Sequence, residues 1–406
     1  MRKSMTGNNR YIKEMNKSII LDLIRTSGGI SRKSLADKTG LSPTASGAIV
    51  RKLLNDGYIW EVGEGESSGG RKPVMLELKP RSYFAFGFDI DVRYIYTTVL
   101  DLTGGVVYRH KLNNDSGLSV RRAVETTAQE YKKALSELKL SGSRILGAGV
   151  SVPGMMELET RRIVLAPNLG WSNADLLGPL HKALNIPIYL DNESMCSANC
   201  ENWLGQCRNV EDFICINIES GIGAGIFMRG KMYRGFSGSA GEIGHIPVDE
   251  NGPQCKCGNR GCLETVASIN GMAARVSGRI KVAGNQAEAG RAADITEDMT
   301  VDLTFKKLLE RAREGDPESL GILEDAAVSL GKALANLINT LNPQKIVLGK
   351  RFPEYSELML GRIRETAGKY ALSYPSAHVD IVSSEFGEDS SALGAAIIPI
   401  RKLFGR

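Results

Sequence analysis

Apolar residues near the start of the chain recur at helical spacing. From Asn9 to about Arg25 they lie three or four positions apart, which predicts an amphipathic helix that ends at Gly28-Gly29. Ser31 is a suitable N-cap for a second helix, and Gly40 is a suitable residue to end it. The apolar positions of the first helix are Ile12, Met15, Ile19, Ile20, Leu23 and Ile24.

A third helix is predicted to begin at Ser42, because serine caps helices and Pro43 fits the first helical position. Two β-rich runs follow at 58–62 and 74–78, joined by a polar Gly/Ser loop with a basic tip at 67–73. Three helices and a two-stranded wing predict a winged helix-turn-helix domain over residues 1–81. The inward side of the third helix is predicted to carry Ala45, Ile49, Val50, Leu53 and Leu54.

The outward side of this helix and the wing carry the candidate DNA contacts. Small polar side chains at the start of a helix can enter a major groove, while basic ones meet phosphates. A narrow basic loop is typical of a segment that enters a minor groove. Helical triplets with a basic surplus also occur in protein-interaction modules, so that alternative stays open. The candidate DNA-binding residues are Ser42, Thr44, Ser46, Gly47, Arg51, Lys52, Arg71 and Lys72.

From residue 82 to 406 the pattern alternates between apolar strands and helices. This order predicts an α/β fold of two lobes with a cleft between them. The polar stretch Lys281–Asp298 is expected to be irregular. Strands are predicted at 84–89, 94–101, 106–108, 145–152, 186–190, 213–218, 225–228 and 345–348, and late helices at 329–340 and from 391.

The 406 residues carry a net charge of +5, and the basic excess lies at the start of the chain. Residues 1–81 hold 15 Lys/Arg and 8 Asp/Glu, whereas the rest hold 36 and 38, so the first domain is the candidate for contact with a polyanion. No apolar run approaches the roughly 18 residues of a membrane span, and the first ten residues lack the apolar centre of a signal peptide. We therefore expect no membrane insertion and a cytoplasmic location.

The seven cysteines are an odd number in a large chain, which argues against a disulfide framework. Cys255, Cys257 and Cys262 follow His245 within a Gly-broken loop at about 245–262, and three sulfurs and one nitrogen suit tetrahedral Zn²⁺. Four protein ligands would make this zinc structural. Free surface thiols are the alternative. The other four, expected to be small core residues on helices or strands, are Cys196, Cys200, Cys207 and Cys215.

The same region carries the signature of a known family. Gly241-Glu242-Ile-Gly244-His245, followed by Cys255-x-Cys257-Gly258-x-x-Gly261-Cys262-x-Glu264, resembles the motif of the ROK family of bacterial sugar kinases and sugar-responsive repressors. The winged helix, the Gly-Arg-Lys-Pro tip and the length resemble its repressor branch, the NagC, Mlc and XylR type. The resemblance covers nearly the whole chain.

This resemblance implies an actin/hexokinase-like fold whose cleft holds a monosaccharide. Metal binding by His245 would orient the adjoining loop, so that the carboxylates meet the sugar already positioned. A sugar pocket and a structural zinc would thus share one side chain. The positions that match the family's sugar contacts are Asn192, Glu193, Glu242, His245 and Glu264, with Gly154 as a further wall of the pocket.

The resemblance also predicts that kinase chemistry has been lost. The first phosphate loop, Asp-x-Gly-Gly-Thr in the kinases, corresponds to 89–93 here, where both glycines are replaced and Asp91 adds a carboxylate. In the second loop Glu219 puts negative charge where phosphates would lie, so repulsion is expected. The catalytic aspartate position is Glu193, and a shift of about 1 Å in a base can lower the rate roughly a hundredfold.

These observations predict a non-enzymatic repressor of carbohydrate-utilisation genes that a monosaccharide releases from operator DNA. A homodimer or a dimer of dimers is expected, because symmetric operators match two-fold symmetric proteins. Two alternatives stay open. One is an ATP-dependent sugar kinase that retains a DNA-binding arm, and the other is a regulator that answers to a phosphosugar or a protein partner.

Overall fold

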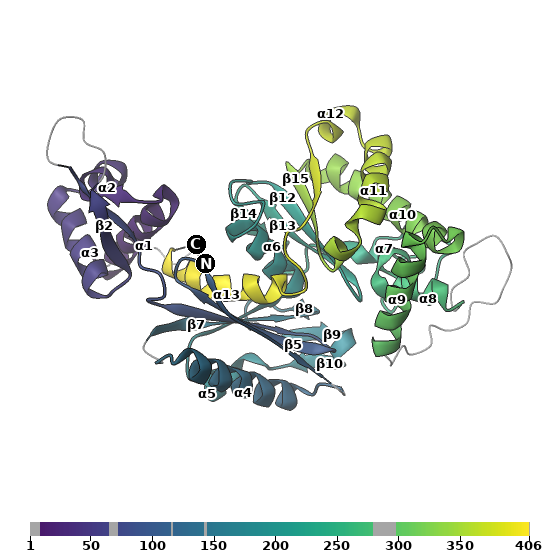
Figure 1. The fold of residues 1–406 in the computed structure, drawn as a ribbon, viewed down its shortest axis with the longest axis horizontal. Helices are drawn as coiled ribbons and strands as arrows, with labels where there is room; N and C mark the ends of the chain where they lie inside the picture. Colours follow the sequence, from purple (N-terminus) through teal and green to yellow (C-terminus); the bar gives the residue numbers. More distant parts are fainter. Residues whose placement is uncertain (1–8, 65–71, 115–116, 142–143, 279–297, 406) are drawn as a thin grey trace.

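The computed structural model describes residues 9–64, 72–114, 117–141, 144–278 and 298–405, which form a small head followed by two larger lobes (Figure 1). Within these ranges no helix is long and apolar enough to cross a membrane. Most of the stretch expected to be irregular, and the tip of the wing, lie outside the described residues.

The head has the predicted helices and wing strands. Ser31 caps the second helix by accepting a hydrogen bond from the Ser34 N–H, Gly40 ends it at φ +67°, and Ser42 caps the third through the Ala45 N–H. A two-residue strand was not predicted, because it is too short to show a period. The elements are α1 (Asn9–Ser27), β1 (Ile30–Ser31), α2 (Arg32–Thr39), α3 (Pro43–Asn55), β2 (Ile59–Glu64) and β3 (Val74–Leu78), with sheet order β1-β3-β2.

The predicted orientation of α3 is wrong at its start. Ser46, expected to face DNA, is 1% exposed and lies on the inward side together with Val50 and Leu53. Ala45, expected to face inward, is exposed. Since Ser46, Val50 and Leu53 are spaced i, i+4, i+7, the buried stripe passes through the serine and turns its neighbour towards solvent.

Lobe I is a five-stranded sheet in the order β11-β7-β4-β5-β6, with helices on both faces. Helix α13 lies so close that a Cβ on Gly87 or Gly149 would come within 1.9 Å of a carbonyl oxygen of that helix. A three-stranded sheet of β8, β9 and β10 extends this lobe. The elements are β4 (Phe84–Ile90), β5 (Tyr94–Asp101), β6 (Val106–Asn113), α4 (Val120–Leu138), β7 (Ile145–Val152), β8 (Met155–Met156), β9 (Ile163–Ala166), β10 (Trp171–Ala174), α5 (Leu177–Leu184), β11 (Ile188–Asn192) and α13 (Ser390–Leu403).

Lobe II repeats this plan with the sheet order β14-β13-β12-β15-β16. Helix α6 packs on β12 and β13 and crosses α13, while the other helices build a large apolar core against the sheet. Two α/β lobes were predicted, and the structure confirms them. The elements are α6 (Glu193–Trp203), β12 (Phe213–Ile218), β13 (Ile222–Met228), β14 (Lys231–Tyr233), α7 (Leu263–Ala267), α8 (Ile269–Val276), α9 (Asp298–Arg313), α10 (Pro317–Leu341), β15 (Lys345–Lys350), α11 (Ser356–Tyr370), α12 (Ser373–Ser376) and β16 (Asp380–Ser383).

Candidate functional site

A cavity of about 270 Å³ lies between the two lobes. Its walls come from the turn after β7, the end of β11, the turn between β12 and β13, and the loop that leads to the cysteine cluster. This volume is near the lower end of small-molecule pockets, which span roughly 300–1,000 Å³. All six residues expected to contact a sugar line the cavity: Gly154, Asn192, Glu193, Glu242, His245 and Glu264.

The lobe I wall depends on one amide side chain. Asn192 caps α6 by accepting a hydrogen bond from the Ser194 N–H at 2.8 Å, and its amide nitrogen donates to the Gly154 carbonyl at 2.8 Å. Gly154 has φ +102°, and a Cβ there would lie 2.3 Å from the Leu165 carbonyl oxygen. Glycine is therefore required at this turn, and it holds the asparagine at the cavity wall.

The lobe II wall carries two carboxylates and one imidazole. Glu264, in the first turn of α7, accepts a hydrogen bond from the Ile222 N–H at 3.1 Å. The Nε2 of His245 lies 4.0 Å from the Glu242 carboxylate. The close approach of Glu264 to the β12–β13 turn requires Gly221, since a Cβ there would lie 2.4 Å from its carboxylate oxygen. Gly221 is therefore needed for the close packing of the Glu264 side chain against this turn.

The predicted metal ligands form a single cluster. The ligand atoms of His245, Cys255, Cys257 and Cys262 all lie within 4.8 Å of one another. His245 Nδ1 is 3.6 Å from the Cys255 sulfur, and the sulfurs of Cys257 and Cys262 are 3.6 Å apart. A tetrahedron of about 2.3 Å radius, the Zn–S distance, has edges of about 3.8 Å. The donor set and its spacing therefore fit a tetrahedral metal ion.

The imidazole of His245 connects this cluster to the cavity. Its Nδ1 faces the Cys255 thiol, while its Nε2 faces Glu242. Any ion held by the cluster would fix the orientation of a side chain that also lines the cavity. The four remaining cysteines are buried, as predicted, although Cys207 lies in a turn instead of on a helix or strand.

A buried group of charges lies where the two phosphate loops meet. Lys350, at the end of β15, donates to Asp89 of β4 at 2.8 Å and lies 3.6 Å from the Glu219 carboxylate. Arg93 of the β4–β5 turn pairs with Asp91 and reaches across to Glu219 of the β12–β13 turn. Two ion pairs join the lobes: Lys350 of lobe II pairs with Asp89 of lobe I, and Arg93 of lobe I pairs with Glu219 of lobe II. We call the five residues of this group the ionic cluster: Asp89, Asp91, Arg93, Glu219 and Lys350.

Glu219, which was expected to repel phosphates, is paired with two cations in the structure. Burial raises the pKa of Glu219, but the cations Lys350 and Arg93 outweigh burial and hold it below its ordinary value. The carboxylate of Glu219 thus stays ionised but is paired within the protein. The side chains of Asp91 and Val92 stand at the positions where the resemblance predicts the two glycines of the first phosphate loop.

Glu193 lies between the ionic cluster and the cavity. Its carboxylate is within 4.8 Å of those of Asp91 and Glu219, and it also lines the cavity. Burial raises its pKa to about 8; Lys350 opposes this rise, whereas Asp89 and Glu219 add to it. The protonated form of Glu193 is therefore favoured more strongly than in an ordinary glutamate, and in this form the carboxyl can donate a hydrogen bond.

Sequence reasoning missed two features of the site. Lys350 was not identified, because its partner Asp89 is 261 residues away. Arg234 was also missed; it forms a bidentate ion pair with Asp191 at 2.6 and 2.7 Å, and both line the cavity. The only local signal for Lys350 was a charged residue at the end of an apolar strand run.

The outer face of the head presents most of the candidate DNA contacts. Thr44, Arg51 and Lys52 are exposed on α3, and Gly47 is half-buried beside them. Ser42 is exposed but already accepts the Ala45 N–H. On the wing, Lys72 is exposed, whereas Arg71 lies outside the described residues. Four of the candidate DNA contacts thus lie on the exposed side of α3, whereas Ser46 is buried.

Comparison with known proteins first gives the class. Winged helix-turn-helix DNA-binding domains match residues 9–59, and the ROK family matches residues 85–402. The protein is therefore a DNA-binding head joined to a two-lobed domain with an interlobe cavity. The chain belongs to the ROK family.

Two relatives are similar over nearly the whole chain. The xylose repressor of Bacillus subtilis (strain 168) is 29% identical over 393 residues, which are 96% of each chain. The DNA-binding transcriptional dual regulator NagC of Escherichia coli (strain K12) is 28% identical over 399 residues, 97% of this chain and 94% of that one. The similarity thus includes both the head and the lobes.

Two solved structures share the fold. The structure of a ROK family transcriptional regulator, a homolog of the E. coli MLC protein, has a TM-score of 0.80 at 26% identity and covers 97% of both chains. A ROK family glucokinase from Streptomyces griseus, in complex with glucose and AMPPNP, has a TM-score of 0.65 at 25% identity. It covers 98% of its own chain but 77% of this one, so about a quarter of this chain has no counterpart in that kinase.

Proposed function

We propose that this protein is a transcriptional repressor that binds operator DNA through its head and is released by a monosaccharide in the interlobe cavity. One observation carries the proposal: a winged helix-turn-helix domain is joined to a ROK domain, and full-length similarity extends to a xylose repressor and to NagC. Repression is favoured over activation because the name of the xylose relative states it.

The sugar would be held by hydrogen bonds from both walls of the cavity. Asn192 supplies an amide, and Glu242 and Glu264 supply carboxylates, which together recognise the hydroxyl groups of a pyranose. Gly154 forms a further wall of the pocket, and Glu193 adds a carboxyl that can donate a hydrogen bond when it is protonated. The effector class is a neutral monosaccharide, and the relatives suggest D-xylose, D-glucose and N-acetyl-D-glucosamine as test sugars, the panel sugars below.

The DNA contacts would come from the exposed start of α3 and from the wing. Thr44 and Gly47 are small enough to let α3 approach base edges, whereas Arg51, Lys52 and Lys72 would meet phosphates. Ser42 would contribute only through the exposed N-terminus of the helix. A two-fold operator would be bound by a homodimer or a dimer of dimers.

The cysteine cluster would hold structural Zn²⁺ through His245, Cys255, Cys257 and Cys262. The ion would supply no chemistry to a substrate, because four protein ligands complete its tetrahedral shell. Its effect would be to hold the loop and the His245 ring in place against the sugar.

Catalysis is not part of the proposed function. A sugar kinase needs a base placed beside the attacking hydroxyl and space for nucleotide phosphates. Here the base position is occupied by Glu193, which is one methylene longer than the aspartate of the kinases, and Asp91 and Val92 stand where the first phosphate loop has its glycines. The alternative, a sugar kinase that retains a DNA-binding arm, predicts ATP consumption that depends on a panel sugar.

The proposal is tested by measuring DNA affinity with each panel sugar and without ATP. A duplex selected by the purified protein from a random library serves as the probe. We expect at least one panel sugar to weaken binding, and Glu242→Gln to bind the duplex normally while losing the response. The proposal would be contradicted if none of the three sugars changed the DNA affinity of the wild type. Turnover of ATP at ordinary enzyme rates would contradict it as well.

A further inference from the structure

The ion pair between Arg234 and Asp191 joins the two walls of the cavity. We propose that Arg234 is a positioning residue of the sugar site, which acts through Asp191 to hold Asn192 of lobe I in place opposite Glu242 of lobe II. This inference rests on the proposed function, because it concerns how the same cavity would recognise a monosaccharide.

The guanidinium of Arg234 meets the carboxylate of Asp191 as a two-pronged fork. Nη1 donates to Oδ1 at 2.7 Å and Nη2 donates to Oδ2 at 2.6 Å. Asp191 lies near the end of β11 in lobe I, whereas Arg234 follows β14 in lobe II. The side chain of Asp191 is 6% exposed and that of Arg234 is 26% exposed, so the pair is largely shielded from water. Two parallel hydrogen bonds fix the orientation of the carboxylate as well as its distance.

The carboxylate of Asp191 in turn holds the next residue. Its Oδ1 also accepts the backbone N–H of Asn192 at 3.0 Å. The amide side chain of Asn192 donates to the Gly154 carbonyl and accepts the Ser194 N–H, both at 2.8 Å. An amide nitrogen carries two hydrogens, so one N–H of Asn192 is left for a sugar hydroxyl. The ion pair thus orients a donor on the cavity wall.

On the other side of the cavity, Arg234 belongs to the loop that leads to Glu242. The Arg234 carbonyl accepts the Ala240 N–H at 3.1 Å, which closes this loop on itself. Gly241 then lies directly on β13, where a Cβ would come within 1.9 Å of the Ala224 carbonyl oxygen. One closed loop therefore holds both Arg234 and Glu242 against the sheet of lobe II.

A path of direct contacts thus runs from one wall of the cavity to the other. It passes from the Glu242 loop through Arg234 and Asp191 to Asn192. Hydrogen bonds weaken once the distance between donor and acceptor exceeds about 3.2 Å, so a sugar that contacts both walls needs them at a fixed separation. Without Arg234, Asp191 would lose its cation and its hold on Asn192 would loosen.

The test is a calorimetric titration of the panel sugars into the full-length protein without DNA. In Arg234→Gln the Kd is expected to rise about tenfold, the usual effect of losing about one hydrogen bond. Arg234→Lys keeps the cation but not the fork, so its Kd should rise by a smaller factor. Arg275→Gln is the matched control, because it removes another short Arg–Asp pair of lobe II, with Asp325 at 2.6 Å, and neither residue lines the cavity. It should bind the sugar like the wild type.

Asn192→Ser separates positioning from a direct sugar contact or general damage. Serine can still cap α6, but it has no amide to offer the sugar. If Arg234 acts through Asn192, adding Arg234→Gln to this variant should raise the Kd by less than about twofold, because coupled residues are not additive. A residue that touched the sugar itself, or that only stabilised the fold, would weaken binding by the same factor in both backgrounds.

The outcomes distinguish this role from the proposed function. A wild-type Kd in Arg234→Gln, or equal losses with and without Asn192→Ser, would overturn the positioning role and leave the repressor proposal standing. A wild type that binds a panel sugar without any change in DNA affinity would contradict the repressor proposal alone, and one that binds none of them would contradict both. If Arg234→Gln does not fold, the same comparison with Asn192→Ser is made with Arg234→Lys.

Discussion

Lys350 holds the two lobes together from a position with no access to solvent. Its side chain is 0% exposed, and its partners Asp89 and Glu219 are 1% and 3% exposed. It also has φ +58°, a left-handed conformation that is unfavourable for a side chain with a Cβ. A charged residue held in this conformation at the end of a strand indicates that the ion pairs offset a local strain.

Removal of this ammonium group should be strongly destabilising. Lys350→Met leaves Asp89 buried without a cation and leaves Glu219 with Arg93 alone, and breaking a buried pair in this way costs about 3–5 kcal/mol of unfolding free energy. Lys345→Met is the matched control on the same strand, since its partner Asp380 is 57% exposed, and it should cost about 1 kcal/mol or less. Urea unfolding measures both. Equal losses in the two variants would contradict the assigned role of Lys350.

Glu193 should make stability depend on pH. Its pKa is about 8 in the folded chain against an ordinary 4.5, because it is buried and faces Asp89, Asp91 and Glu219, with Lys350 in opposition. Between these two values the folded state holds a proton that the unfolded chain has lost. The contribution of Glu193 to folding stability is therefore complete below pH 4.5 and is lost as the pH rises towards about 8.

The corresponding experiment compares the wild type with Glu193→Gln across this range. The variant should gain relative stability as pH rises from about 5 to about 8, by a few kcal/mol at most, and then stay level. Chemical unfolding at a series of pH values gives the difference. Parallel curves for the two proteins would show that Glu193 titrates normally.

The residues of the cavity could be predicted from sequence only where they belong to a local motif. Glu242, His245 and Glu264 lie within one short signature, and Asn192 follows a recognisable strand, so their place in the cavity could be predicted. The roles of Lys350 and Arg234 could not be predicted, because each depends on a partner that only folding brings near.

At the scale of elements, helix α3 shows how a helical pattern can be misread by one position. Apolar residues alone suggested Ala45 as part of the buried face, but the small hydroxyl of Ser46 fits there instead. Small residues carry little hydrophobic signal, so packing decides which of two neighbours is buried. The predicted start and N-cap of α3 were unaffected, because serine and proline mark a helix start through backbone chemistry.

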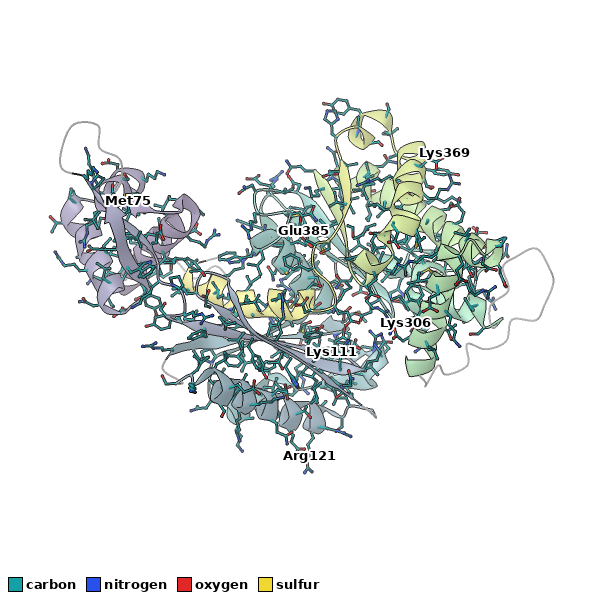
Figure 2. The ribbon with its side chains drawn as sticks, viewed as in Figure 1. Met75, Lys111, Arg121, Lys306, Lys369 and Glu385 are labelled. Atoms are coloured by element: carbon teal, nitrogen blue, oxygen red, sulfur yellow. The ribbon has the colours of Figure 1, made fainter. Side chains whose placement is uncertain are left out.

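The exposed basic residues of α3 should set the salt dependence of DNA binding. The double variant Arg51→Ala/Lys52→Ala should lower the slope of log affinity against log salt by about 2, since each lost phosphate contact lowers it by about 1. Arg121→Gln is the control, because Arg121 lies on α4, far from the head (Figure 2). A double variant with the wild-type slope would place the phosphate contacts elsewhere.

The cysteine loop should carry an equimolar metal ion that supports the cavity. Purified wild type is expected to contain about one zinc per chain, and Cys257→Ser should lose it and melt at a lower temperature, because metal binding is coupled to folding of its loop. Cys215→Ser changes a buried cysteine outside the cluster and should keep the metal. Elemental analysis decides this, and a wild type without zinc would refute the assignment.

At the scale of the whole molecule, one apolar cluster spans the joint between the head and the lobes, which also have clusters of their own. A single cluster of buried residues includes Leu21 and Leu53 of the head together with Leu393 and Ile397 of α13. The sequence predicted the head and the two lobes as separate units, because each has its own periodic pattern. It did not predict their joint, since no local pattern reports which surfaces of two units meet.

The central claim is that a sugar in the cavity and DNA on the head influence one another. Linkage requires that DNA change the sugar affinity by the same factor as the sugar changes the DNA affinity. The most direct test is a calorimetric titration of a panel sugar into the free protein and into its complex with the selected duplex. The account predicts weaker sugar binding in the complex, by the factor measured for DNA release, and identical sugar affinities in the two titrations would contradict it.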